Sequence, residues 1–591
     1  MTTVRSLMTF FSVALVFAPH VSSAQESAPP AAAKTPAKNL LDVIPDDIWA
    51  MIYLPSLAQL DEKVGMYAQR LNLPMMFAPT MMARMMTGLS NGVDDRREFA
   101  VVLFPVSDTS KVGDSTAILI PTTDHGSLIA LLSPEDVGDG VSKITLMDKP
   151  AFTASTGGYS IMAPTRDVLN RLLKATKTIH SKFNRHQLDR LATDDVTVWA
   201  NFGALVSSDL FAGFVKMAEA TGSFYGLGQM PDFNTLAVSL RHEPTGLALG
   251  FYMDAKPDTE MRAALAGMPN TTDSLLNGLP GGPFLFAGGE IRSKAISTLA
   301  AKMFDEWLSD LDDQSPNETE KTGAVGGKQT GRVLKRVRAP IKTLIENLAR
   351  IAISVSPQPE GSDGMVTVAK VIATHGDARQ VCSALKEVLD GVKQEFADDA
   401  DTMELLRCIE YKVAAEKAGS LNIDHLVIKF PEQVKNEIGE TGMAAIKAVL
   451  GSDQFLVRIA VVDDRHVAIT LGGGVAYMGK VIQAVKTNAA PLSDDAGIKR
   501  IAKFLAKKRN SEAYFAADRL IKLIGRISKA VGEPFPVTIA DLNAPVAMVE
   551  GKVAPAGAQV DVYIPIELIS AIKDAFTKAM GQQMNAEQPV S

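Results

Sequence analysis

The sequence predicts an α+β fold, in which antiparallel sheets are built from repeated hairpin-plus-helix units and helices pack on one face. The first observation is the stretch 234–267, where two segments alternate apolar and polar residues on either side of a turn at 243–246. Period-two alternation is typical of a strand with one buried face, and Pro244 and Gly246 favour the turn. A short helical pattern follows and ends at Gly267.

The second observation is that this hairpin-plus-helix pattern recurs along the chain. Further copies lie at Ala100–Leu132, Ala349–Leu389, Gln454–Val485 and Ala544–Phe576. Hairpins form antiparallel sheet, and the helix that follows each of them must cover its apolar face.

The third observation is a second repeated module, a short apolar strand that runs directly into a helix. Its copies are Trp49–Leu57, Val198–Leu205, Pro283–Ile291 and Glu512–Leu520. We expect the last residues of these copies to be equivalent, each being the first buried residue of its helix. The copies are unequally spaced, which excludes the fixed period of a solenoid and favours an internal duplication.

The N-terminus has the pattern of a signal peptide. Arg5 precedes the apolar run Leu7–Ala18, and Ser22 and Ala24 place small residues before a cleavage site after Ala24. No Cys follows the apolar run, which argues against a lipid anchor. No second apolar run of ~18 residues follows, so we expect no membrane span after cleavage.

These patterns predict five regions. They are a signal peptide at 1–24, a disordered Pro/Ala linker at 25–39, a first α+β half at 40–275, a second α+β half at 276–580 and a disordered tail at 581–591.

Composition excludes several classes of protein. The chain has 591 residues, 46% of them hydrophobic, and a net charge of −7, which argues against general nucleic-acid affinity. Two cysteines, Cys382 and Cys408, are too few for a disulfide scaffold. They flank the acidic stretch 398–401, so we expect them close together on paired helices, either bonded or as free thiols.

Two glycine-rich motifs mimic catalytic signatures. Gly474–Lys480 resembles a phosphate-binding loop, but Val481 stands where that chemistry needs a hydroxyl. We therefore interpret Gly472–Gly474 as a turn. Gly88–Gly92 matches the spacing of a nucleophile elbow but follows a Met-rich helix, so we interpret it as a helix C-terminus.

The spacing of the histidines predicts no metal site, because no pair has the i, i+4 spacing of a helical zinc site. His125-Gly126 and His375-Gly376 occupy the same strand-to-helix loop of two modules. Duplicated cap loops account for them, and a paired ligand or acid–base role is the alternative. The sequence assigns no catalytic residue, no cofactor-binding residue and no metal ligand.

Three further segments each carry two interpretations. Met75–Met86 contains six methionines and is a core or interface stripe, or else a surface for an apolar ligand or Cu(I). The segment 304–342 places carboxylates before cations and is a surface loop between two solvated faces, or else an excursion that binds an anionic partner. Ser493–Arg509 is an amphipathic helix that packs on the core, or else lies on a membrane surface.

The stretch Ile44–Leu57 (IPDDIWAMIYLPSL), together with the hairpin-plus-helix units, resembles a group of exported bacterial proteins catalogued only as a domain of unknown function. The resemblance implies an exported α+β protein and carries over no activity. The sequence thus favours a non-enzymatic envelope or periplasmic protein that binds an apolar ligand or a partner. The alternative is a hydrolase whose site assembles from distant residues, recognisable by a cleft that joins a nucleophile, a His and a carboxylate.

Overall fold

The structure is a computed structural model that describes residues 38–586 apart from some internal segments. The segments outside the description are 74–77, 82–90, 107–111, 147, 209–231, 314–326, 363, 490, 533–534, 536, 538 and 554–555. The predicted signal peptide lies outside the described residues. So does most of the predicted linker.

The chain divides into two compact units. Unit 1 is Met1–Arg262 with Pro555–Gln559, and unit 2 is Ala263–Ala554 with Val560–Ser591. The division falls inside the helix α9 (Glu260–Gly267), whereas the sequence analysis placed the boundary between its two halves at 275/276.

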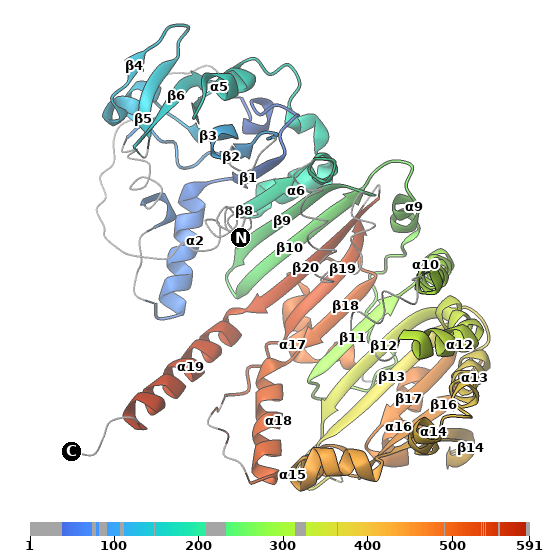
Figure 1. Cartoon of the computed structure of the whole chain (residues 1–591). Helices are drawn as coiled ribbons and strands as arrows, with labels where there is room; N and C mark the ends of the chain where they lie inside the picture. Colours follow the sequence, from blue (N-terminus) through green and yellow to red (C-terminus); the bar gives the residue numbers. More distant parts are fainter. Residues whose placement is uncertain are drawn as a thin grey trace. The chain divides into compact units, whose positions relative to one another are not determined.

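The sheet of unit 1 is antiparallel throughout (Figure 1). Its strands, in spatial order, are β4 (Glu135–Asp136), β5 (Ser142–Leu146), β6 (Lys149–Thr156), β7 (Tyr159–Ala163), β3 (Thr116–Pro121), β2 (Phe99–Leu103), β1 (Ala50–Leu54), β8 (Val196–Ala200), β9 (Phe233–Glu243) and β10 (Gly246–Ala255). Its α-helices are α2 (Leu57–Arg70), α4 (His125–Ile129), α5 (Arg166–Leu173), α6 (Arg185–Thr193) and α7 (Phe202–Val206).

The core of unit 1 lies on the sheet face that carries Met51, Leu119, Ile161 and Trp199, all of them buried. The helices α5 and α6 contribute apolar side chains to the same cluster, among them Leu169. In β9 and β10 the predicted buried face is wrong: the more buried residues are small or polar ones such as Ser239 and Ala248, whereas the alternating apolar residues are half-buried and Phe251 is 37% exposed.

Unit 2 repeats the strand order of unit 1. In spatial order its strands are β14 (Ile409–Ala418), β15 (Leu421–Lys429), β16 (Gln454–Val461), β17 (His466–Leu471), β13 (Val366–Thr374), β12 (Leu348–Pro357), β11 (Phe286–Ile291), β18 (Ser511–Phe515), β19 (Val546–Val553) and β20 (Gly557–Pro565, of which 560–565 belong to unit 2). Its α-helices are α10 (Lys294–Asp313), α12 (Gly327–Asn347), α13 (Arg379–Glu395), α14 (Ala400–Arg407), α15 (Glu432–Leu450), α16 (Gly474–Thr487), α17 (Ala496–Ala502), α18 (Ala517–Ala530) and α19 (Ile566–Ala586).

The first to tenth strands of each unit thus pair in one and the same order. The predicted α+β fold with antiparallel hairpins is confirmed. The shared order agrees with an internal duplication, which itself stays a prediction, because a strand order can arise without common ancestry. The helix α19 continues to Ala586, into the region predicted as a disordered tail.

The strand-into-helix modules exist, but the expected equivalence of their last residues is wrong. Leu57 is the first residue of α2 and is 7% exposed. Leu205 and Leu520 lie within the first turns of α7 and α18 and are half-buried, and Ile291 ends the strand β11. The side chain of Asn201 caps α7 and starts that helix earlier, so Phe202 takes the buried position.

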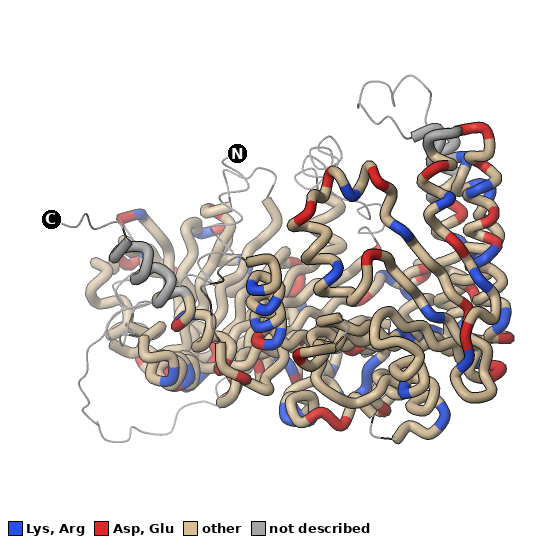
Figure 2. The backbone as a smooth tube through the Cα atoms, turned by 90° about the horizontal axis from the view of Figure 1, so that it is seen from below, with Lys and Arg blue, Asp and Glu red and all other residues tan. Residues whose placement is uncertain are grey.

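The described parts of the acidic-then-basic segment 304–342 are helical, and the expected loop at its centre lies outside the described residues. Its described parts belong to α10 and α12, which pack together, and acidic and basic residues lie side by side on them (Figure 2). Asp305 on α10 forms ion pairs with Arg338 (2.7 Å) and Lys342 (2.9 Å) on α12. These cations have a partner within their own unit, which accounts for them without an external anion.

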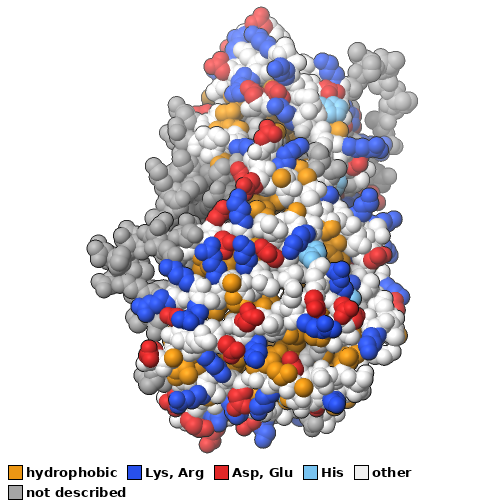
Figure 3. Space-filling model, turned by 90° about the vertical axis from the view of Figure 1, so that its right-hand side faces the viewer, with side chains coloured by type: hydrophobic (Ala, Val, Ile, Leu, Met, Phe, Trp, Pro, Cys, Tyr) orange, Lys and Arg blue, Asp and Glu red, His pale blue; other side chains and the backbone are white. Residues whose placement is uncertain are grey.

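The surface carries charges of both signs. On the face shown in Figure 3, Lys and Arg side chains are interspersed with Asp and Glu. This mixing is what a net charge of −7 with 60 basic and 67 acidic residues predicts.

Candidate functional site

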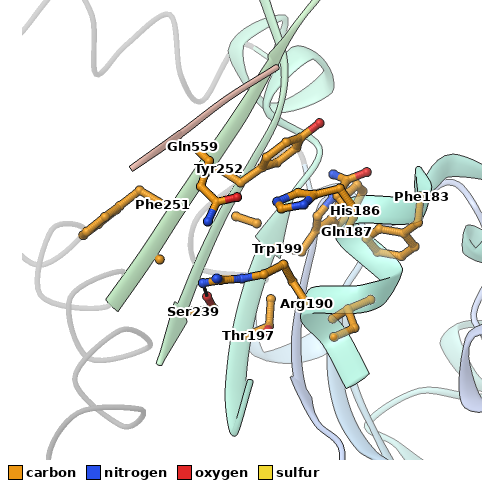
Figure 4. A pocket seen from close by; sticks show the side chains of 13 residues that line it. Phe183, His186, Gln187, Arg190, Thr197, Trp199, Ser239, Phe251, Tyr252 and Gln559 are labelled. Carbon is orange, nitrogen blue, oxygen red and sulfur yellow. Dashed lines mark hydrogen bonds between the residues drawn. The ribbon is translucent and has the colours of Figure 1, made fainter. Parts of the chain in front are cut away.

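A small enclosed cavity lies in unit 1 between α6 and the strands β8, β9 and β10 (Figure 4). The helix α6 begins with a capping box formed by Asn184 and Gln187, which places Arg190 over the sheet. Nη2 of Arg190 donates to Ser239 Oγ at 2.9 Å. A Cβ at Gly250 would collide with this guanidinium, so the glycine lets Arg190 lie flat on the strand.

The cavity matches a single water molecule. It offers about 20 Å³, and a bound water needs ~10–15 Å³ with polar partners. Two atoms that line it, Trp199 Nε1 and Thr197 Oγ1, are buried and have no hydrogen-bond partner among the described residues. Small-molecule pockets measure ~300–1,000 Å³, so this cavity is a water site and not a ligand site.

A polar cluster on the same unit contains the carboxylate–histidine pair Asp195 and His242. Asp195 Oδ2 lies 2.9 Å from His242 Nδ1, and its Oδ1 accepts from Lys63 Nζ at 2.6 Å. Burial alone would raise the pKa of Asp195, but the hydrogen bonds from His242 and Lys63 outweigh it and lower that pKa. Asp195 is therefore held as a carboxylate.

This pair lacks the third member of a hydrolytic triad. Among the described residues no Ser, Thr or Cys side chain hydrogen-bonds to His242. Its ring instead meets Tyr67 edge-on, with centroids 5.1 Å apart, and the Tyr67 hydroxyl donates to Glu243 O. The cluster joins α2 to the turn between β9 and β10, which is a structural role.

In unit 2 the helix α18 contacts α15 (Figure 1). Open hollows lie along α18. Hollow A has an apolar floor and a volume of about 770 Å³. Its lining residues are Glu360, Ile521, Lys522, Gly525, Arg526, Lys529, Gly532, Phe535, Val537 and Ile539.

The sequence of α18 accounts for hollow A. Leu523 is buried against the rest of the unit, whereas Ile521 and Gly525, four residues apart, lie on a neighbouring stripe and face the hollow. A Cβ at Gly525 would lie 3.4 Å from Phe535 Cδ1, so the missing side chain opens the floor there. The buried Asp518 accepts from Leu542 N at 2.8 Å and thereby holds the following segment beside the helix.

Hollow B adjoins hollow A and has a volume of about 540 Å³. The two share Glu360, Arg526 and Lys529, so they form one continuous feature, called here the α18 groove. The remaining lining of hollow B is polar or small and comes from the β12–β13 turn and the ends of α15 and α18: Gly361, Ser362, Gly364, Met365, Lys447, Ala448, Gly451 and Ala530.

A third hollow, of about 750 Å³, lies along α16. It is lined mostly by small residues, and its Lys480 is balanced by Asp494 and Asp495. Its apolar surface comes mainly from Ala and Pro, whereas hollow A is lined by the larger side chains of Ile521, Phe535 and Val537.

The glycine motif before α16 is a turn, as the sequence predicted. Gly472, Gly473 and Gly474 all have positive φ (77°, 66° and 64°), and α16 begins at Gly474. The elbow-like motif 88–92 and the methionine cluster 75–86 lie largely outside the described residues.

The two His-Gly pairs belong to helix-cap loops in different units. His125 is the first residue of α4, capped by Asp124, and its Nδ1 lies 2.8 Å from Ser160 Oγ. The backbone N–H of His375 donates to Asn347 O at 2.8 Å. Each histidine is held by its own surroundings, as a cap loop requires.

Two further expectations are refined by the structure. The amphipathic helix predicted over 493–509 is shorter, because α17 ends at Ala502; Ile498 and Ile501 are buried, so its apolar face packs on the core. Cys382 lies in α13 and Cys408 caps the C-terminus of α14, and both are free thiols. Their expected proximity stays a prediction.

The α18 groove was not predicted from the sequence. A signal was present, because Lys522, Arg526 and Lys529 follow the i, i+4, i+7 spacing of one helix face. The partners that complete the groove lie up to 169 positions away, at Glu360 and Lys447, and only folding brings them there.

No group of three or more metal-ligating side chains occurs among the described residues. Within the same part of the chain, none of the helices combines the length and the apolar character that crossing a membrane requires.

The chain matches no family model and no curated protein. Among solved structures, crystal form I of TP0453 aligns at 9% identity and a TM-score of 0.20, over 37% of this chain and 79% of that chain. Crystal form IV of TP0453 aligns at 8% identity and a TM-score of 0.22, over 40% and 89%. At these scores the likeness carries no argument about function.

Proposed function

We propose that this is an exported, non-enzymatic protein that binds an apolar molecule, and that the α18 groove is the binding site. The observation that carries the proposal is hollow A, whose apolar floor and volume of about 770 Å³ fall in the range of small-molecule sites. Export rests on the signal-peptide pattern that ends at Ala24 and on the resemblance to exported proteins.

The floor of hollow A favours an apolar guest for a physical reason. Ile521, Phe535 and Val537 are only half-buried, so a ligand that covers them removes apolar surface from water. Each Å² removed from water contributes roughly 25 cal/mol. Micromolar binding corresponds to about −8.2 kcal/mol, and immobilising the ligand costs ~4 kcal/mol or more, so roughly 500 Å² of apolar surface, counted on ligand and protein together, must leave water.

The proposal is tested with a substitution whose side chain fills hollow A from its floor. The variant Gly525→Leu places a branched side chain toward Phe535, and glycine is otherwise unfavourable inside a helix, so we expect α18 to remain folded. Binding of the uncharged fluorescent probe N-phenyl-1-naphthylamine to the full mature chain is titrated by its emission. We expect the affinity to fall at least tenfold.

The matched control is Gly479→Leu. Gly479 is also a helical glycine, it lines the third hollow, and a Cβ there has no neighbour within 4 Å. We expect this variant to bind like the wild type. Absence of probe binding to the wild type, or equal loss in both variants, contradicts the proposal. The export part is tested separately, since N-terminal sequencing of the exported protein should begin at Gln25.

A further inference from the structure

We propose that the ligand of the α18 groove is a single-chain lipid with an anionic headgroup, whose chain lies in hollow A and whose headgroup lies in hollow B. This inference rests on the proposed function and adds the chemical class of the ligand. It follows from the different lining of two hollows that share one rim.

Hollow B presents an excess of positive charge. The described residues that line it include three cations, Lys447, Arg526 and Lys529, and one carboxylate, Glu360. The net charge of this lining is therefore +2, although the chain as a whole carries −7. A local surplus of cations in an acidic protein favours an anionic guest.

The two lysines have no partner of their own. The side-chain ammonium groups of Lys447 and Lys529 make no ion pair or hydrogen bond with any described residue, and both lysines are exposed. Lys522, farther along the same face of α18, differs, because it pairs with Asp541 at 2.5 Å. The cations at hollow B are thus available to a ligand, whereas the cation away from it is neutralised.

Arg526 is positioned between the hollows. Its Nη1 donates to Gln358 O at 2.7 Å, which fixes the guanidinium against the β12–β13 turn. A guanidinium has five N–H donors, so one bond of this kind leaves several for a carboxylate or phosphate. Because Arg526 lines both hollows, it lies where the chain of an amphiphile would meet its headgroup.

The turn beside hollow B is built to lie close to α15. A Cβ at Gly364 would lie 2.9 Å from Gly451 N, so only glycine allows this approach. The N–H of Met365 donates to Ala448 O at 3.1 Å and to Val449 O at 3.0 Å. These bonds occupy the carbonyl groups at the end of α15, which would otherwise repel an anion.

A helix-stabilising role is the competing explanation for the lysines. Lys447 and Lys529 lie in the last turns of α15 and α18, where a cation is favoured by the helix dipole. That role would change stability and would leave the choice between charged and uncharged ligands unaffected. The experiment therefore measures a ratio of affinities.

The probes are dodecanoate and 1-dodecanol, which share a chain length and differ in charge. Each displaces N-phenyl-1-naphthylamine from the full mature chain at low ionic strength. We expect the wild type to bind dodecanoate about tenfold more tightly than 1-dodecanol, the effect of one charge-assisted hydrogen bond. In Lys447→Gln this preference should fall to less than about threefold, with the affinity for 1-dodecanol unchanged.

The control is Lys435→Gln, which removes the same charge from α15 outside the groove, before the break in that helix at Gly439; Lys435 pairs with Glu432 at 2.6 Å. It should keep the preference of the wild type. Equal binding of both probes by the wild type, or the same preference in Lys447→Gln, overturns the headgroup inference while the proposed function stands. If inorganic phosphate displaces the fluorescent probe as effectively as dodecanoate does, the inference that the ligand is a lipid is wrong. Failure of both probes contradicts both proposals.

Discussion

A buried carboxylate in unit 2 offers the sharpest test of how the fold is held. Glu512 on β18 is 1% exposed, and it accepts from Ser274 Oγ (2.8 Å), Leu275 N (2.5 Å) and Tyr514 Oη (3.0 Å). Its Oε2 also lies 3.2 Å from Arg509 Nη1, a side chain that is 12% exposed. One carboxylate thus joins the segment before β11 to the sheet.

The expected loss depends on what replaces the carboxylate. Glu512→Ala leaves Arg509 buried without its counter-charge and removes three acceptor contacts, which should cost ~3–5 kcal/mol of unfolding free energy. Glu512→Gln keeps one acceptor oxygen for Ser274 and Leu275 and loses the charge, so about 1–3 kcal/mol is expected.

The control is a second glutamate–arginine pair that is exposed. Glu290 lies 2.5 Å from Arg292, and their side chains are 40% and 28% exposed. Exposed pairs contribute ~0–1 kcal/mol, and losing the repulsion between Glu290 and Glu550 acts in the opposite direction, so Glu290→Gln should change stability little.

Thermal denaturation followed by circular dichroism measures the three variants, and hydrogen exchange at β18 assigns the transition to unit 2. A loss of 1 kcal/mol corresponds to roughly 2 °C in Tm for a unit of this size. We expect a fall of ~6–10 °C for Glu512→Ala and a smaller fall for Glu512→Gln. Shifts below about 1 °C in both variants would refute the reasoning.

Three further changes test other parts of unit 2. Burial, together with nearby Glu290, raises the pKa of Glu550, so its contribution to stability is present below the unfolded pKa of about 4.3 and is lost as the pH rises. In thermal melts the variant Glu550→Gln should therefore be more stable than the wild type at pH 7 and similar to it at pH 4. A variant that is less stable than the wild type at pH 7 would contradict this prediction. Gly289→Ala would place a Cβ 2.5 Å from Leu275 O and should lower the unfolding free energy by ~1–3 kcal/mol, measured by urea denaturation. An unchanged urea midpoint would contradict this, because it would mean that the segment around Leu275 moves away without cost. Burial raises the pKa of the Cys382 thiol to about 11, so iodoacetamide at pH 8 should modify it far more slowly than a free peptide thiol, as mass spectrometry of the labelled peptide would show.

The repeated modules were accessible to sequence reasoning because they depend on neighbours in the chain. The alternation in β9 and β10 indicates two strands, and the turn residues between them fix the hairpin. Which face of these strands is the more buried was not accessible, because Ser239 and Ala248 are buried while Phe251 is exposed. All five hairpins followed by a helix are present in the structure. Helix starts were less accessible. The helix α7 begins after its cap at Asn201 and α18 begins at Ala517 without a side-chain cap, so the first buried residue of each helix precedes the expected Leu205 or Leu520.

The site was not accessible in the same way. Ile521 and Gly525 belong to one helix, so their shared face can be read from their spacing. Glu360 and Lys447 come from a turn and a different helix, and their place beside Arg526 depends on the strand order of unit 2. Spacing along the chain carries no information about that order.

The sequence by itself determined the α+β class, the hairpins and the turn at Gly472–Gly474, because each depends on interactions between residues that are near one another in the chain. Only the tertiary structure decided the common strand order of the two units, the single-water size of the cavity beneath α6 and the gathering of cations at hollow B. These features arise from packing between distant segments. Their energies depend on which surfaces meet after folding.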